Sequence, residues 1–188
     1  MTRIKVKIGS KKDFKELAKL DFSNTCNKMF DISYTDNNIA VSEVDLQKPI
    51  VNKSENYVDE ILEDMIPKTE DKNFVPLVVF SNNMPAGYLM AKWDKWPNGK
   101  VLVVEGILVA NQFAGKGLAK ALVGGTIETA KQNKECRGIH VELDTTKYQA
   151  NKLFLRMGFK FAGTKFYIYS KEDPRKYSKE AVFFYYKT

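Results

Sequence analysis

The chain has 188 residues and a formal net charge of +7, and this length suits one domain with a core of its own. Its one histidine, His140, excludes a histidine-based triad and a histidine-rich metal site. Cys26 and Cys136 have no metal-binding or redox spacing, so we expect free thiols in a reducing compartment. The chain has no basic and apolar leader and no run of about 18 apolar residues, which predicts a soluble cytoplasmic protein.

The positive charge is unevenly distributed along the chain. Residues 31–72 contain eleven acidic and four basic residues, so the rest of the chain carries +14. A basic body attracts a ligand that bears several phosphates, although scattered solvated lysines also explain much of the excess. Neither an arginine-rich helix nor an aromatic RNA-binding signature is present, so we expect no nucleic-acid partner and no membrane partner. The sequence leaves a homodimer open.

Local patterns predict a strand, a helix, an irregular segment and a second strand at the start of the chain. Residues 4–8 alternate apolar and basic side chains, as a half-buried strand does. Ser10 can cap a helix over residues 11–20. Residues 21–36 are polar and irregular, and residues 39–46 predict a short strand that a following proline helps to end.

The next predicted element is an amphipathic, acidic helix. Residues 57–66 place apolar side chains on one face and acids on the other, and Pro67 predicts the end of the helix. A run of charges of this kind is usually a solvated face. The sharper alternative is an acidic rim that attracts a polyamine-like substrate.

The second half of the chain predicts strands that alternate with helices. A hairpin signal at residues 81–85 joins two strands, and Pro97-Asn98-Gly99 marks the next turn. The whole order predicts one α+β domain, residues 1–188, with a mixed, mostly antiparallel sheet and helices on both faces. The predicted strands are residues 75–80, 86–93, 101–109, 139–143, 159–169 and 181–186. One predicted helix begins at Leu118, a second spans residues 149–157, and a charged loop covers residues 170–179.

The junction after the strand at residues 101–109 has the features of an anion site. Gly115 and Gly117 precede the helix that begins at Leu118. The first N–H groups of a helix have no intrahelical partner and lie at the positive end of its dipole. Glycine has no Cβ, so an anion can approach this backbone closely. The junction therefore predicts a phosphate or pyrophosphate site, with a tight loop that binds nothing as the alternative.

This strand, loop and helix resemble the central motif of the GNAT acetyltransferases, in which a Q/R-x-x-G-x-G/A loop binds the pyrophosphate of acetyl-coenzyme A. Residues 138–143 are similar to the family's next strand, and residues 149–159 are similar to the following helix with its Gly-Phe exit. Within the superfamily the chain is most similar to the streptothricin acetyltransferase branch, because of Trp96, Glu105 and the closing residues 181–186.

The resemblance implies transfer of an acetyl group from acetyl-coenzyme A to an amine, which must lose a proton before it attacks. Glu105 lies in an apolar run, where burial could make it a stronger base, and an outward-facing strand residue is the alternative. The resemblance places the oxyanion donor among the backbone N–H groups of residues 107–109. The residues that it implies for cofactor binding are Ile107, Leu108, Val109, Gln112, Gly115, Lys116, Gly117, Leu118, Ala119, Lys147, Ala150 and Phe154.

The first departure from the family concerns the leaving thiolate. The family commonly has a tyrosine where this chain has Phe154, and that hydroxyl is taken to protonate the thiolate. Tyr148, Tyr167 or Tyr169 are possible replacements, with Tyr167 as the candidate catalytic acid, although tyrosines in such positions more often pack. A thiolate with a pKa of about 8.5 also leaves without protonation.

Three further departures concern the strand and the acceptor. Gly106 stands where the related branch usually has an aspartate, and it can permit a bulged strand beside the cofactor. Lys147 replaces an asparagine and Lys165 replaces an aspartate of that branch. We therefore predict an acetyl-coenzyme A-dependent N-acetyltransferase, without a metal, for a primary amine of a small cationic acceptor such as a streptothricin-type antibiotic. The alternatives are a protein, peptide or polyamine acceptor, or a coenzyme A-binding sensor without activity.

Overall fold

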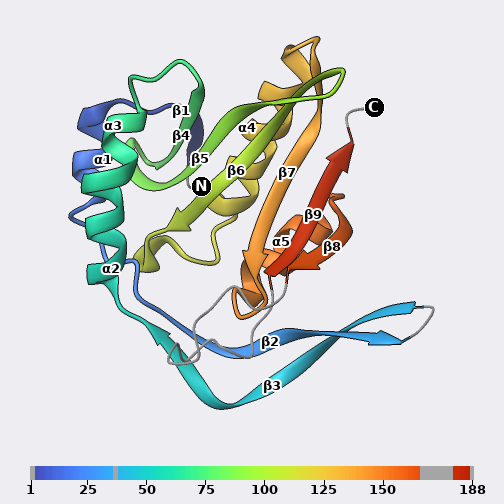
Figure 1. The fold of residues 1–188 in the computed structure, drawn as a ribbon. Helices are drawn as coiled ribbons and strands as arrows, with labels where there is room; N and C mark the ends of the chain where they lie inside the picture. The colour runs from blue at the N-terminus through green and yellow to red at the C-terminus, as the bar shows by residue number, and fades with distance from the viewer. Residues whose placement is uncertain (1–2, 36–37, 166–179, 187–188) are drawn as a thin grey trace. The chain divides into compact units, whose positions relative to one another are not determined.

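The computed structural model describes residues 3–35, 38–165 and 180–186 (Figure 1). Tyr167, Tyr169, the predicted loop at 170–179 and the end of the strand predicted to reach residue 169 lie outside the described residues. The chain is divided into two compact units. The first comprises Met1–Asn24, Asn52–His140 and Tyr186–Thr188, and the second comprises Thr25–Val51 and Val141–Tyr185.

The first unit is built on a sheet in which β1, β4, β5 and β6 pair antiparallel, and its order follows the predicted hairpins. The two hairpin turns contain left-handed residues, with φ of 49° at Asn82, 67° at Asn83 and 65° at Asn98. Asparagine tolerates this conformation better than most residues, so the turn chemistry fixes where each strand reverses. The strand order is β1 (Ile4–Ile8), β4 (Phe74–Ser81), β5 (Met84–Trp96), β6 (Gly99–Val109) and β7 (Cys136–Asp144), and β7 continues into the second unit.

Helices cover both faces of this sheet. Phe14 of α1 (Lys11–Leu17) packs on Tyr88 with ring centroids 5.4 Å apart. Gly125 of α4 (Leu118–Gln132) lies against Val6 and Leu77 on the other face. The predicted α+β class and the helices on both faces are confirmed, because alternating strand residues supply an apolar surface to each helix layer.

The helix α1 begins as predicted and ends early. Ser10 and Asp13 form a capping box, in which the Ser10 side chain accepts from the Asp13 N–H and Asp13 accepts from the Ser10 N–H. Both donors would otherwise lack an intrahelical partner. The last helical residue is Leu17, whereas the sequence pattern predicted the end at residue 20.

The acidic helix continues through Pro67, which corrects the predicted end at residue 66. It consists of α2 (Ser54–Asp59), a π-helical turn η1 (Glu60–Met65) and α3 (Ile66–Lys68). In the π-turn, the Ile66 N–H donates to the Ile61 carbonyl, one residue further back than in an α-helix. A proline ring collides with the preceding turn of a regular α-helix, and the wider turn accommodates it.

The second unit contains a two-stranded sheet that the sequence patterns did not predict correctly. Its strands are β2 (Asn24–Thr35), where an irregular segment was expected, and β3 (Asn38–Asn52), which runs through Pro49. A sheet of only two strands leaves an outer edge on each strand, where a residue without an N–H is tolerated. Phe30 of β2 is buried, and its N–H donates to the Thr145 carbonyl at 3.0 Å, a contact distant in sequence.

The rest of the second unit agrees with the predicted order. The helix α5 (Tyr148–Arg156) follows β7, and its Phe154 packs edge-on against Phe159 with centroids 4.9 Å apart. The strands β9 (Glu180–Tyr186) and β8 (Lys160–Lys165) pair antiparallel, with β9 next to β7. Within the described residues, no helix is both long and apolar enough to cross a membrane.

The close approach of β5 and β6 gives a test of the fold. A Cβ at Gly87 would lie 2.5 Å from the Leu108 carbonyl oxygen and 2.9 Å from the Val109 Cα. We expect Gly87→Ala to lower the free energy of unfolding by about 2 kcal/mol, because backbone atoms cannot give way. The control is Gly124→Ala in α4, where a Cβ meets nothing within 4 Å and should raise that free energy by about 0.5–1 kcal/mol. Urea unfolding measures the free energy of unfolding of both variants. Equal changes in the two variants would contradict the pairing register of β5 and β6.

Candidate active site

A β-bulge in β6 positions the candidate catalytic residue. Met90 of β5 pairs with Gly106, and Ala91 pairs with Val104, so Glu105 is the extra residue of β6. Adjacent residues of a regular strand point to opposite faces. Here Glu105 contacts Lys68, and a Cβ built on Gly106 points at Glu60 and Met65, so both residues face the Ser54–Lys68 helix. The expected bulge at Gly106 is confirmed, and it re-aims Glu105.

Glu105 lies in an ion-pair network rather than in an apolar pocket. The Lys68 ammonium lies 2.8 Å from Glu105 Oε2 and 2.8 Å from Asp64 Oδ2. It also lies 5.3 Å from the centroid of the Phe74 ring. The residue Glu105 is exposed and 27% of its side chain is accessible, so the expected burial is wrong. The network nevertheless shows that two carboxylates and an aromatic face hold an alkylammonium group at the bulge.

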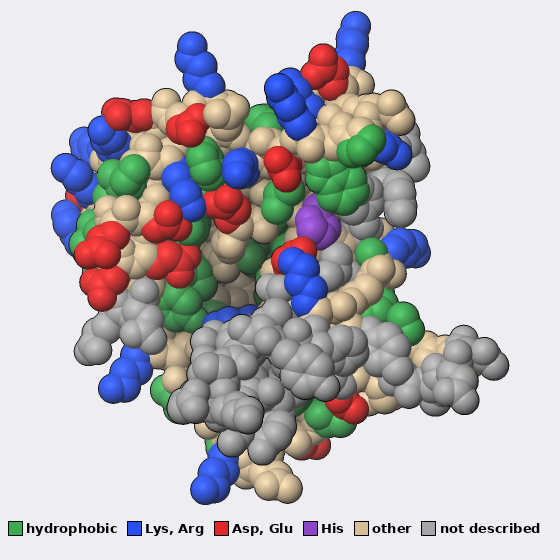
Figure 2. All heavy atoms as spheres, viewed as in Figure 1, with side chains coloured by type: hydrophobic (Ala, Val, Ile, Leu, Met, Phe, Trp, Pro, Cys, Tyr) green, Lys and Arg blue, Asp and Glu red, His purple; other side chains and the backbone are tan. Residues whose placement is uncertain are grey.

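A second carboxylate, one of the acids of the predicted acidic helix, lies over the same bulge. The Tyr88 hydroxyl donates to Glu60 Oε1 at 3.1 Å, and the Tyr88 residue is fully buried. Burial and the charge of Glu60 raise the pKa of Tyr88 well above its ordinary value, so the hydroxyl keeps its proton. A Cβ on Gly106 would lie 3.6 Å from Glu60 Oε1. Figure 2 shows acidic side chains gathered over the region where Figure 1 places α2 and α3.

The predicted anion loop has an open backbone. It follows a 3-10 turn, η2 (Asn111–Phe113), and φ is +74° at Gly115 and +80° at Gly117, which is the N-cap of α4. A Cβ on either glycine would meet nothing within 4 Å, so conformation and not crowding favours glycine at both positions. The buried Phe113 and Leu118 hold the two ends of the loop. The exposed N–H groups at the start of α4 therefore suit a phosphate-bearing ligand.

The remaining predicted cofactor residues of the first unit flank this loop. Ile107, Leu108 and Val109 are half-buried and pair with β5 at residues 87–89. Lys116 is exposed, its ammonium donates to the Gln112 carbonyl at 3.1 Å, and it lies 5.4 Å from the Phe113 ring centroid. Ala119 is half-buried in the first turn of α4. The first unit thus brings Glu105 and the predicted residues 107–119 onto one strand and the turn that follows it.

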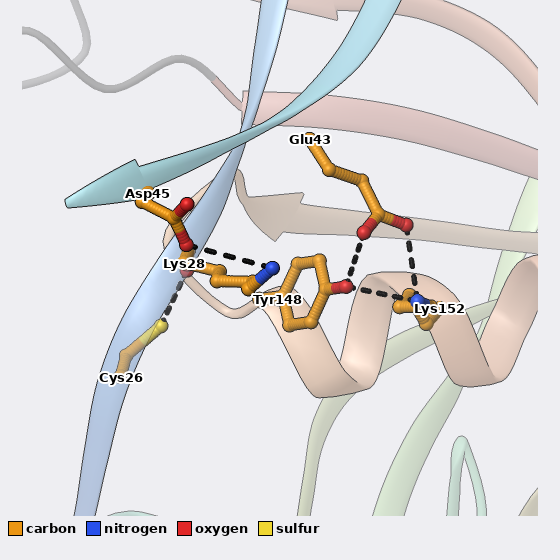
Figure 3. A network of polar contacts seen from close by, with 6 residues as sticks. All are labelled: Cys26, Lys28, Glu43, Asp45, Tyr148 and Lys152. Atoms are coloured by element: carbon orange, nitrogen blue, oxygen red, sulfur yellow. Dashed lines mark hydrogen bonds and ion pairs between the residues drawn. The ribbon is translucent and has the colours of Figure 1, made fainter.

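Tyr148 of the second unit is committed to a local network and is not a free acid. Its hydroxyl donates to Glu43 of β3 and accepts from the Lys152 ammonium at 2.8 Å (Figure 3). Lys152 also lies 3.0 Å from Glu43 Oε1. The hydrogen bond from Tyr148, followed by that from Lys152, lowers the pKa of Glu43. These contacts join β3 to α5 and argue against Tyr148 as the replacement for the missing family tyrosine.

The other predicted residues of the second unit lie on or near α5. Lys147 is half-buried at its N-cap, Ala150 is half-buried in its first turn, and Phe154 is fully buried. Phe154 packs as a core residue and has no proton to donate. Lys165 forms an ion pair with Glu142 of β7. Tyr167 is outside the described residues, so its role as an acid stays a prediction.

Within the described residues, no group of three or more histidine, cysteine, aspartate or glutamate side chains could hold a metal ion. Cys26 and Cys136 are free, as predicted.

The match to a family model gives the class of this protein. The family model for the Acetyltransferase (GNAT) family matches residues 39–159, which is more than half of the chain. The chain belongs to the GNAT acetyltransferase family and is an N-acetyltransferase by that membership. Among curated proteins, a sequence search matches none.

Solved structures share this fold at low sequence identity. A nourseothricin acetyltransferase superposes with a TM-score of 0.72 at 21% identity, covering 97% of this chain and 96% of the other. A Bacillus anthracis protein assigned as a streptothricin acetyltransferase, in complex with acetyl coenzyme A, gives 0.79 at 19%, covering 98% and 100%. An N-acetyltransferase from Staphylococcus aureus gives 0.62 at 17%, covering 98% of each. At these identities the likeness shows the fold.

The ion-pair network predicts an unreactive lysine. Desolvation lowers the pKa of Lys68, but hydrogen bonds to Asp64 and Glu105 outweigh it and raise the pKa overall. A raised pKa leaves less neutral amine at a given pH, so competitive labelling with acetic anhydride at pH about 9 should modify Lys68 more slowly than the exposed Lys120. Asp64→Asn should speed labelling of Lys68 and leave Lys120 unchanged. Equal rates in the unmodified protein would contradict the network.

Proposed function

We propose that this N-acetyltransferase moves the acetyl group of acetyl-coenzyme A to a primary amine of a small cationic acceptor, with a streptothricin-type antibiotic as the leading candidate. The observation that carries the proposal is the position of Lys68, whose ammonium lies between Asp64 and Glu105 at 2.8 Å from each. The first unit already binds one alkylammonium group beside the bulge of β6. A small acceptor needs the same contacts at its reactive nitrogen.

The proposed chemistry begins with a proton on the acceptor nitrogen. Glu105 accepts it after the acceptor ammonium replaces Lys68 as its partner, so an N–H bond breaks and an O–H bond forms. The neutral nitrogen then attacks the thioester carbonyl and a C–N bond forms. The nitrogen loses its second proton to solvent water, and the C–S bond breaks with its electron pair on sulfur. A backbone N–H within residues 107–109 is the proposed donor to the carbonyl oxygen as it gains charge.

The proposed cofactor cradle is the loop at residues 112–117 with the first turn of α4. Gln112, Gly115, Lys116, Gly117, Leu118 and Ala119 are its members. The open loop and the unpaired N–H groups of a helix start support the binding of a pyrophosphate. Ile107, Leu108 and Val109 are proposed to contact the pantetheine arm, and Lys147, Ala150 and Phe154 remain proposed cofactor contacts. Phe154 supplies no acid, so the thiolate is proposed to leave unprotonated.

A cytoplasmic location remains a proposal, and the free thiols support it. A homodimer also remains a proposal. The alternative acceptors are a polyamine, a peptide or a protein. The alternative of another class is a sensor that binds coenzyme A without turnover, and Phe154 and Gly106 are the residues that favour it.

Thiol release from acetyl-coenzyme A against nourseothricin, spermidine and a lysine-containing peptide tests the function. We expect turnover with nourseothricin and, in Glu105→Gln, a fall in kcat of roughly 100- to 10,000-fold, because a general base contributes about that factor. Glu128→Gln in α4, an exposed residue beside Lys131, is the matched control and should change kcat little. An unchanged kcat in Glu105→Gln would contradict the role of Glu105 as the general base. Binding of acetyl-coenzyme A without turnover of any amine would favour the sensor.

The cradle is tested by a glycine substitution. At φ of +80°, an alanine at residue 117 is strained by about 1–2 kcal/mol, and its Cβ covers the N–H groups that face the ligand. We expect Gly117→Ala to weaken acetyl-coenzyme A binding about tenfold or more by calorimetry. Gly124→Ala, further along the same helix, should bind as the unmodified protein does. Equal affinity in both variants would place the pyrophosphate elsewhere.

A further inference from the structure

Lys68 places an amine of the chain itself where the proposed chemistry needs one. Its ammonium lies 2.8 Å from Glu105 Oε2, and Glu105 is the proposed base for an acceptor ammonium. Among the described residues, Lys68 is the one basic side chain that forms an ion pair with Glu105. The nitrogen of a small acceptor and the nitrogen of Lys68 are therefore alternatives for one position.

The end of the helix fixes the backbone of Lys68 and leaves its side chain accessible. Lys68 is the last residue of α3, and the hydroxyl and the N–H of Thr69 both donate to the Ile66 carbonyl, at 2.8 Å and 3.2 Å. Asp64, four residues earlier, also lies 2.8 Å from the ammonium. The accessible fractions are 22% for the Lys68 side chain and 27% for that of Glu105, so a molecule that reaches the base also reaches the lysine.

The proposed position of the thioester lies on the same strand as Glu105. The proposed donor to the thioester carbonyl is a backbone N–H of residues 107–109, and this segment begins two residues after Glu105. Two residues of a strand span about 7 Å. The flexible four-carbon stem of a lysine lets its ammonium move over part of such a distance. An arrangement that lets an acceptor nitrogen at Glu105 attack the thioester therefore lets Lys68 attack it too.

We propose that Lys68 is itself an acetyl acceptor, which the protein acetylates within one chain. The proposal rests on the proposed N-acetyltransferase function, with Glu105 as the base. The Lys68 ammonium gives one proton to Glu105, and rotation about its last C–N bond turns the lone pair toward the thioester carbonyl. A C–N bond forms, the nitrogen loses its second proton to solvent water, and the C–S bond breaks with its electron pair on sulfur. The products are acetylated Lys68 and the thiolate of coenzyme A.

Uncatalysed acetylation favours other lysines. Desolvation lowers the pKa of Lys68, but hydrogen bonds to Asp64 and Glu105 raise it overall, so the neutral amine is rarer at Lys68 than at an ordinary lysine. The Lys68 side chain is also less accessible than that of Lys131 in α4, at 22% against 44%. Faster acetylation of Lys68 than of Lys131 by acetyl-coenzyme A is therefore evidence of catalysis at Glu105.

Mass spectrometry of the full chain, incubated with acetyl-coenzyme A and no added amine, tests the proposal. We expect Lys68 to gain an acetyl group about tenfold or more faster than Lys131, because a general base contributes roughly 100-fold or more. The rate constant should not change with protein concentration, as for a reaction within one chain. Acetylation of Lys131 as fast as that of Lys68, or a rate constant that rises in proportion to protein concentration, overturns the proposal.

Variants check the base and the acceptor separately. Glu105→Gln should slow the acetylation of Lys68 by roughly 100-fold or more and leave that of Lys131 unchanged. Lys68→Arg keeps the positive charge but stays protonated, so the fast acetylation should disappear. Lys131→Arg is the matched control and should keep it. Thermal unfolding checks that each variant is folded, and unchanged acetylation of Lys68 in a folded Glu105→Gln overturns the proposal.

A competing amine checks that Lys68 and the acceptor use one position. An amine that the protein acetylates, added at about ten times its Kd, should slow the acetylation of Lys68 roughly tenfold, because only about one site in ten then lacks the amine. An unchanged rate at Lys68 in the presence of that amine overturns the shared position and with it the proposal.

The outcomes separate this proposal from the proposed function. A protein that acetylates nourseothricin but not Lys68 overturns the proposal and leaves the proposed function standing. A protein that acetylates Lys68 but not nourseothricin, spermidine or a lysine-containing peptide supports the proposal and overturns the small cationic acceptor. If neither an added amine nor Lys68 gains an acetyl group, both fail.

Discussion

The β6 bulge is the constraint on which the candidate site depends. One extra residue between Val104 and Gly106 breaks the alternation of side chains and turns two adjacent positions toward the Ser54–Lys68 helix. A regular strand would send Glu105 to the opposite face, where α4 packs. The bulge therefore places Glu105 and Gly106 side by side on one face. A Cβ at Gly106 would lie 3.6 Å from Glu60 Oε1, so the carboxylate of the helix packs directly over this position.

The helix that faces the bulge gives the site its charge and its order. Its π-turn begins at Glu60 and precedes Pro67, so the residue that lies over the bulge belongs to the same turn that accommodates the proline. Lys68 satisfies Asp64 and Glu105, whereas Glu60 is held by a buried neutral donor. Such a division holds the carboxylates in place while keeping the net charge of the group negative, which suits the cationic acceptor that we propose.

The second unit limits where an acid for the leaving thiolate can come from. Phe154 is a fully buried packing residue, and Tyr148 is tied to Glu43 and Lys152. Neither presents a free hydroxyl. Since a thiolate is a much better leaving group than an alkoxide, the chemistry tolerates a site without an acid more readily than one without a base. This asymmetry is the physical reason that the proposed activity depends on Glu105 as a base.

The sequence by itself determined the features whose causes are local. The hairpin turns at Asn82 and Asn98, the cap at Ser10 and the glycine loop before α4 depend on a few neighbouring residues, and the family resemblance came from that loop and its flanking elements. Patterns failed for the strand β2 and for the full length of β3, which was predicted only over residues 39–46, because contacts such as Phe30 with Thr145 are distant in sequence. Only the tertiary structure decided that Glu105 pairs with Lys68 and that Glu60 meets Tyr88. Those partners lie on different elements, and the bulge that brings them to one face is set by pairing between strands, which a single segment does not encode.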